Sequence, residues 1–302
     1  MLPGRGVNRH AMLAGMMRAE DSDLEGRVAL ITGANTGIGR VTARELARRG
    51  AQVFIACRSA QRAQPALEET RAASRAEGHN ASVELLRLDL GDFASVRRCA
   101  HEFLARGLPL HLLINNAGLA GAHGLTDSGF EIAFGVNHLG HFLLTQLLLP
   151  CIERSAPARI VSVASKAHYR ARGIDWAALR QPTRSATGLP EYSVSKLTNV
   201  LFSAELGRRL AGRGVATYAL HPGVVASDVW RSVPWPLRSL MKLAMISTEQ
   251  GAATSLHCAT SPVAGGETGL YYDRCRVKTP SALAQDKALA AELWRRSEDW
   301  TH

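Results

Sequence analysis

The sequence predicts a single α/β domain, built on a doubly wound, seven-stranded parallel sheet with helices on both faces. Short apolar segments with the pattern of strands alternate with longer segments with the pattern of helices. That order is typical of parallel sheets with right-handed crossovers. The 302 residues contain neither a linker-like segment nor an internal repeat. We therefore expect one domain over 26–302, preceded by a flexible tail over 1–25.

The expected elements follow one another in regular order. Strands are predicted at 28–32, 52–56, 83–88, 110–114, 159–163, 215–220 and 269–272. Helices are predicted at 40–49, 59–77, 93–105, 129–151 and 192–211. In such sheets, ligands bind outside the carboxyl ends of the strands. The loops that follow the strands are therefore expected to form one cleft.

The first strand runs directly into the turn Gly33-Ala-Asn35-Thr36-Gly37-Ile38-Gly39. Glycines permit a tight turn and close approach to a pyrophosphate, and the following helix offers free N–H groups and its positive dipole end. This pattern predicts the phosphate-binding corner of a Rossmann-type dinucleotide site. The spacing Gly-x-x-x-Gly-x-Gly is less common than Gly-x-Gly-x-x-Gly, and an ordinary glycine-rich turn is the alternative.

Two arginines predict which dinucleotide is bound. In NAD sites an acidic residue about 20 positions past the glycines holds the ribose, whereas NADP sites have an arginine nearby. Here Arg58 stands at the end of the second strand, and Arg40 directly follows the last glycine. Guanidinium groups can hold a phosphate bidentately. We therefore expect NADP(H), the alternative being two solvated surface arginines.

The composition indicates an ordinary globular domain. Apolar residues make up 46% of the chain and charged residues 21%. The net charge is +10, yet no basic run is interleaved with aromatics, so we expect no nucleic-acid partner. The five cysteines show neither Cys-x-x-Cys pairs nor metal spacing. This favours reduced thiols, an intracellular protein and no metal site.

No segment has the sequence of a membrane span. The apolar patch 11–17 in the tail is too short, and the apolar stretch 141–152 is broken by Thr145, Gln146 and Pro150. We expect a cytoplasmic protein. Its basic charge leaves peripheral contact with a membrane surface open.

Tyr192 and Lys196 lie four residues apart, on one face of a predicted helix. A free phenol has a pKa near ~10, and a nearby cation favours the phenolate. The pair is a candidate general acid/base for the proton that accompanies hydride transfer. In isolation, an exposed helix pair is the stronger interpretation.

Taken together, the motifs resemble the short-chain dehydrogenase/reductase family over about 24–299. They follow the family's order: the turn 32–39, Asp89-Leu90, Asn115-Asn116-Ala117-Gly118, Asn137, Ser165, Tyr192 with Lys196, and Pro222-Gly223. Within that family, Ala56-Cys57-Arg58 and the segment 136–145 are similar to the retinol dehydrogenases of the 11-to-14 group. Members of that group use NADP(H) to interconvert retinoid or other lipophilic aldehydes and alcohols.

The resemblance implies a role for each matching residue. Ser165 would hydrogen-bond the substrate oxygen, Tyr192 would exchange its proton, and Lys196 would lower the tyrosine pKa and bind the nicotinamide ribose. Asn137 would hold a water that links Lys196 to solvent. The other expected cofactor contacts are Asp89, Leu90, Asn116, Ala117, Gly118, Pro222, Gly223 and Val225. We expect His221 to be structural.

The substrate side is expected to lie in two segments. An insertion at about 169–189 precedes Tyr192, and a lid at about 226–248 carries tryptophans and aliphatic residues with interspersed cations. The apolar side chains suit a small lipophilic carbonyl compound or alcohol, although the lid segment could equally be an amphipathic helix packed on the body. The short polar tail departs from the membrane anchor common in the group, which puts retinoids in doubt.

Three functions compete. The leading one is an NADP(H)-dependent oxidoreductase; the second is a non-catalytic NADP(H)-sensing regulator on the same fold. The presence of all four catalytic-type residues argues against a sensor, which needs no proton relay. The third, a basic nucleic-acid-associated protein, has no visible readout element. A homodimer through the helices near 129–151 and 192–211 is left open.

Overall fold

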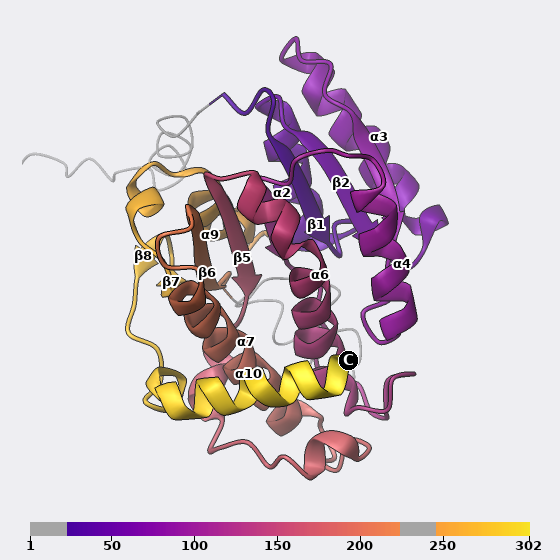
Figure 1. Cartoon of the computed structure of the whole chain (residues 1–302). Coiled ribbons are helices and arrows are strands. Elements are labelled where there is room, and N and C mark those ends of the chain that lie inside the picture. The colour runs from indigo at the N-terminus through magenta and orange to yellow at the C-terminus, as the bar shows by residue number, and fades with distance from the viewer. Residues whose placement is uncertain (1–22, 224–245) are drawn as a thin grey trace, which may run out of the picture.

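A computed structural model describes residues 23–223 and 246–302, and its centre is one twisted sheet (Figure 1). The strand order is β3-β2-β1-β4-β5-β6-β7-β8. The strands are β1 Val28–Thr32, β2 Gln52–Cys57, β3 Val83–Arg87, β4 Leu112–Asn115, β5 Ala158–Val163, β6 Val215–His221, β7 Leu270–Asp273 and β8 Arg276–Val277. The first seven are parallel, as predicted, whereas β8 pairs antiparallel with β7. The prediction of seven strands missed this short edge strand.

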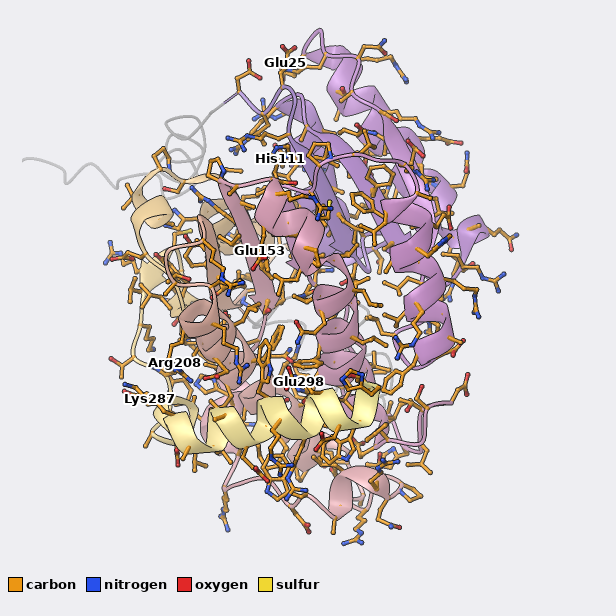
Figure 2. All side chains as sticks on the ribbon, viewed as in Figure 1. Glu25, His111, Glu153, Arg208, Lys287 and Glu298 are labelled. Carbon is orange, nitrogen blue, oxygen red and sulfur yellow. The ribbon has the colours of Figure 1, made fainter. Side chains whose placement is uncertain are left out.

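Helices cover both faces of the sheet (Figure 1). They are α2 Gly37–Arg48, α3 Ala60–Ala76, α4 Phe93–Leu104, α5 Ile132–Phe134, α6 Gly140–Arg154, α7 Leu189–Arg209, α9 Thr248–Thr260 and α10 Lys287–Thr301. Apolar residues of α2, α3 and α9 pack on one face, and those of α4, α6 and α7 on the other. Charged side chains such as Arg208 and Lys287 lie on the outside of these helices (Figure 2). This is the doubly wound arrangement that the sequence predicts.

The strands alternate their side chains between the two faces. In β1, Ala29 and Ile31 belong to the core on one side of the sheet, and Val28 and Leu30 to the core on the other side. Because both faces are covered, every residue of β1 is buried. Burial on both faces explains why the strand appears in the sequence as a continuous apolar run.

The helix expected at 129–151 begins at Ile132 instead and contains a π-helical turn, η1 Gly135–Leu139, before α6. The whole helix Ile132–Arg154 is long and apolar enough to cross a membrane by length and composition. However, 72% of its apolar window is buried inside the domain. Its apolar character therefore has a direct explanation in the core between α4 and α7.

Candidate functional site

The glycine turn joins β1 to α2 in the conformation that the motif requires. Gly33 and Gly37 have φ angles of +68° and +57°, in the left-handed region that favours glycine. A Cβ on Gly39 would lie 2.4 Å from Nδ2 of Asn116. The turn therefore needs glycine at two positions for backbone geometry, and at Gly39 for close packing.

The turn opens into a cavity of about 1330 Å³ at the carboxyl ends of the strands. Sixteen of the residues expected to bind cofactor or substrate line it: Gly33, Asn35, Thr36, Gly37, Ile38, Arg58, Asp89, Leu90, Asn116, Ala117, Gly118, Ser165, Tyr192, Lys196, Pro222 and Gly223. Gly39, Arg40 and Asn137 lie near it without lining it. Val225, and residues 226–245 of the expected lid, lie outside the described residues.

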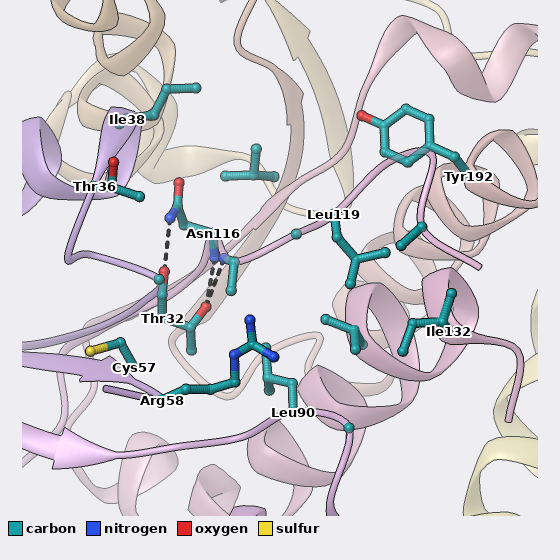
Figure 3. A pocket seen from close by; sticks show the side chains of 18 of the residues that line it. Thr32, Thr36, Ile38, Cys57, Arg58, Leu90, Asn116, Leu119, Ile132 and Tyr192 are labelled. Atoms are coloured by element: carbon teal, nitrogen blue, oxygen red, sulfur yellow. Dashed lines mark hydrogen bonds between the residues drawn. The ribbon is translucent and has the colours of Figure 1, made fainter. Parts of the chain in front are cut away.

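Asn116 connects the ends of β1 and β4 at the floor of this cavity (Figure 3). Its side-chain Nδ2 donates to the carbonyl oxygen of Thr32 at 2.8 Å, and its backbone N–H donates to Oγ1 of Thr32 at 2.9 Å. The N–H of Ala117 donates to the same hydroxyl at 3.0 Å. The glycine turn and the loop after β4 are thus held in one fixed arrangement.

The catalytic candidates meet at the opposite end of the cavity. Tyr192 and Lys196 lie one turn apart on α7, and both are buried. Lys196 Nζ donates to the carbonyl oxygen of Val163 at 2.8 Å and lies 5.7 Å from the centre of the Tyr192 ring. Ser165, directly after β5 and Ala164, is hydrogen-bonded to Tyr192. The three residue types expected for proton transfer therefore lie together.

Burial controls the ionisation of this pair. It raises the pKa of Tyr192 to about 12, against the opposing effect of the Ser165 hydrogen bond. It lowers the pKa of Lys196 to about 7, because the ammonium is removed from water. Lys196 is not among the groups that shift the pKa of Tyr192 in this structure, so its expected effect on the tyrosine stays a prediction.

Asn137 is fully buried in the π-helical turn and acts as a junction. Its Oδ1 accepts from the N–H of Leu119 at 2.9 Å, and its Nδ2 donates to the carbonyl oxygen of Leu119 at 3.0 Å and to Oγ of Ser195 at 2.9 Å. The Ser195 hydroxyl in turn donates to the carbonyl oxygen of Tyr192 at 2.8 Å. Asn137 therefore ties the loop after β4 to the helix that carries Tyr192.

The two arginines expected at the phosphate end differ in position. Arg58 extends into the cavity, and its Nη1 lies 3.9 Å from Oδ2 of Asp89 (Figure 3). Arg40 forms an ion pair with Glu69 of α3 and does not line the cavity. Arg62, which the sequence reasoning missed, does line it. Its position four residues after Arg58, in the first turn of α3, could have indicated this.

The segment between Ser165 and α7 forms part of the cavity wall through Lys166, Ala167 and Arg170. Oγ1 of Thr183 donates to Glu131 at 2.5 Å, which holds the far part of the segment. Nδ1 of His221 accepts from the N–H of Lys166 at 3.3 Å. His221 also lines the cavity, so its purely structural role stays a prediction.

Comparisons with known proteins identify the family of this chain. The short chain dehydrogenase family model matches residues 27–179. Retinol dehydrogenase 12 of Mus musculus is 45% identical over 94% of this chain and 89% of its own. A crystal structure of an uncharacterised protein from Mycobacterium paratuberculosis is 35% identical, with a TM-score of 0.72 over 92% of this chain and 94% of the other. RhlG of Pseudomonas aeruginosa, in an NADP active-site complex, is 26% identical, with a TM-score of 0.65 over 83% and 95%. The chain belongs to the short-chain dehydrogenase/reductase family, in the group of the retinol dehydrogenases 11 to 14.

Proposed function

We propose that this protein transfers a hydride between NADP(H) and a small lipophilic aldehyde or ketone, or its alcohol, with Tyr192 as general acid/base. The observation that carries this proposal is a single cavity with two ends. Ser165, Tyr192, Lys196, the glycine turn and Arg58 all line it, and Figure 3 shows Tyr192 far from Thr36 and Arg58. A dinucleotide suits this distribution, because its reactive ring and its phosphates lie at opposite ends of the molecule.

The residues at the phosphate end fit the cofactor. Gly33 and Gly37 of the turn line the cavity, where backbone without a side chain lets a pyrophosphate approach closely. Arg58, half exposed at the cavity wall, could hold a 2′-phosphate. The relative RhlG, described in complex with NADP, supports the same assignment. When bound, the cofactor supplies or accepts the hydride.

The chain's own residues would manage the proton. The Ser165 hydroxyl would donate a hydrogen bond to the carbonyl oxygen of the substrate, and the Tyr192 hydroxyl would deliver the proton as that oxygen becomes an alcohol. With its pKa raised to about 12, Tyr192 holds its proton at neutral pH and is ready to act as the acid for reduction. Oxidation of an alcohol needs the phenolate form of Tyr192. The positive charge of an oxidised nicotinamide ring near Tyr192 would favour that form.

The test is NADPH oxidation followed at 340 nm with a panel of lipophilic aldehydes, ketones and retinal. We expect turnover by the wild-type protein and a loss of about 10²- to 10⁴-fold in Tyr192→Phe, with NADPH affinity unchanged within threefold. Tyr169→Phe is the matched control, because Tyr169 is outside the cavity lining and donates its hydroxyl to the carbonyl oxygen of Thr279 at 2.6 Å. Retained turnover in Tyr192→Phe would reject the mechanism. NADPH binding without any turnover would favour the sensor.

A further inference from the structure

His141 is a buried histidine of α6 to which neither the family motifs nor the proposed mechanism gives a role. It lies one helical turn beyond Asn137 and is 3% exposed. Its Nδ1 lies 3.0 Å from the carbonyl oxygen of Asn137, and its Nε2 lies 2.8 Å from Oγ1 of Thr32. One imidazole therefore contacts both Asn137 and Thr32, the last residue of β1.

The chemistry of the partners determines the tautomer. A carbonyl oxygen only accepts hydrogen bonds, so the proton of His141 must be on Nδ1. Burial lowers the pKa of His141 to about 4, so the ring is neutral and Nε2 carries a lone pair. The hydroxyl of Thr32 must then donate to Nε2. The direction of both hydrogen bonds follows from these constraints.

The same hydroxyl has two lone pairs, and both are used. They accept the backbone N–H groups of Asn116 and Ala117, which line the cavity after β4. The Thr32 hydroxyl thus makes three hydrogen bonds, and its proton points to Nε2 of His141 at 2.8 Å rather than to the more distant carbonyl oxygen of Ile114 at 3.5 Å. A buried network satisfied to this degree is rigid, and loss of one member leaves its partners unpaired.

We propose that His141 is a positioning residue that couples the cofactor side of the cavity to the catalytic side. Through Thr32 it orients the loop that begins at Asn116. Through the carbonyl oxygen of Asn137 it fixes the junction that holds α7. The glycine turn and Tyr192 are thereby kept in a constant relative position, as hydride transfer between bound partners requires.

His138 provides a matched control on the same helical segment. It is also buried, and burial lowers its pKa to about 3. Its Nε2 contacts Oγ of Ser297 on α10 at 3.1 Å, and its Nδ1 has no hydrogen-bond partner among the described residues. Its ring packs against Phe134 and Phe202, and His138 does not line the cavity. Substituting His138 removes a buried imidazole without disturbing the network.

The first test uses the cofactor-free protein and measures hydrogen exchange in peptides that contain the N–H groups of Asn116 and Ala117. We expect His141→Phe and the isosteric Thr32→Val to accelerate exchange at least tenfold there, with His138→Phe unchanged. Thr32→Ser, which keeps the hydroxyl, should restore slow exchange. Equal exchange in wild type, His141→Phe and Thr32→Val would overturn the proposal.

The second test measures NADPH affinity and kcat, and its kinetic part rests on the proposed function. We expect His141→Phe and Thr32→Val to lower both NADPH affinity and kcat at least tenfold, and His138→Phe to lower its melting temperature while keeping both within threefold. Equal losses in the two histidine variants would make the effect merely structural and overturn the proposal. If the wild-type protein reduces no carbonyl compound, the proposed function fails, while hydrogen exchange and NADPH affinity still decide the role of His141.

Discussion

Replacement of Arg58 by alanine should remove the preference for NADPH over NADH. Arg58 lines the cavity beyond the end of β2, and its side chain is 52% exposed. A hydrogen bond to a charged group contributes about 1.5–3 kcal/mol, and exposure places Arg58 at the lower end of that range. A loss of about 1.5 to 2 kcal/mol corresponds to about 10- to 30-fold weaker NADPH binding. NADH binding should change by less than threefold.

Arg40→Ala is the control for the loss of an arginine near the glycine turn that does not line the cavity. Arg40 is paired with Glu69 and does not line the cavity, so its replacement should weaken NADPH binding by less than threefold. Affinities for both cofactors can be measured by fluorescence titration at two salt concentrations. The NADPH affinity of the wild-type protein should fall more steeply with salt than that of Arg58→Ala. An unchanged NADPH preference in Arg58→Ala, or a larger loss in Arg40→Ala, would refute the reasoning.

Three further changes test the fold and the site. Gly39→Ala places a Cβ 2.4 Å from Nδ2 of Asn116, so NADPH affinity measured by titration should fall at least tenfold; unchanged affinity would contradict the packing argument. Burial lowers the pKa of Lys196 to about 7 from 10.5, so the unfolded protein binds more protons between those pH values and stability rises with pH there. The free energy of unfolding in urea should increase from pH 7 to pH 10 in the wild-type protein, and increase less in Lys196→Met. An equal increase in both proteins would count against the lowered pKa. Trp294→Ala empties a buried aromatic position and should reduce the free energy of unfolding by about 3 to 5 kcal/mol, whereas a loss below 1 kcal/mol would show that α10 contributes little.

The strands could be predicted because burial on both faces requires a continuous run of apolar residues, which is visible in the sequence. β8 has two exposed residues and therefore shows no such run. Helices α9 and α10 were not predicted from the sequence either. For α10 a signal was present, because Ala290, Leu293 and Trp294 follow helical spacing after the N-cap Asp286.

Within the site, residues near a motif could be predicted, whereas pairings across space could not. The motif brings Arg40 to the right corner, but only the packing of α3 on α2 shows that Glu69 holds its guanidinium. Likewise, the spacing of Tyr192 and Lys196 predicts their proximity, whereas their pKa values depend on desolvation by the surrounding fold. Cytoplasmic location and membrane contact stay predictions.

The position of α10 bears on the homodimer left open by the sequence. α10 packs on α7, and its Trp294 reaches Phe142 in the first turn of α6; these are the two helices through which dimerisation was considered (Figure 1). Its Trp294 ring lies 5.1 Å from that of Phe142 and 5.9 Å from that of Phe202, and the guanidinium of Arg209 lies 4.2 Å from the Trp294 ring centre. A second copy could reach these side chains only by displacing α10 and exposing Trp294. We therefore expect light scattering at micromolar concentration to give the mass of one chain, 32.5 kDa. A mass of two chains would contradict this expectation and would require an interface outside the surface that α10 covers.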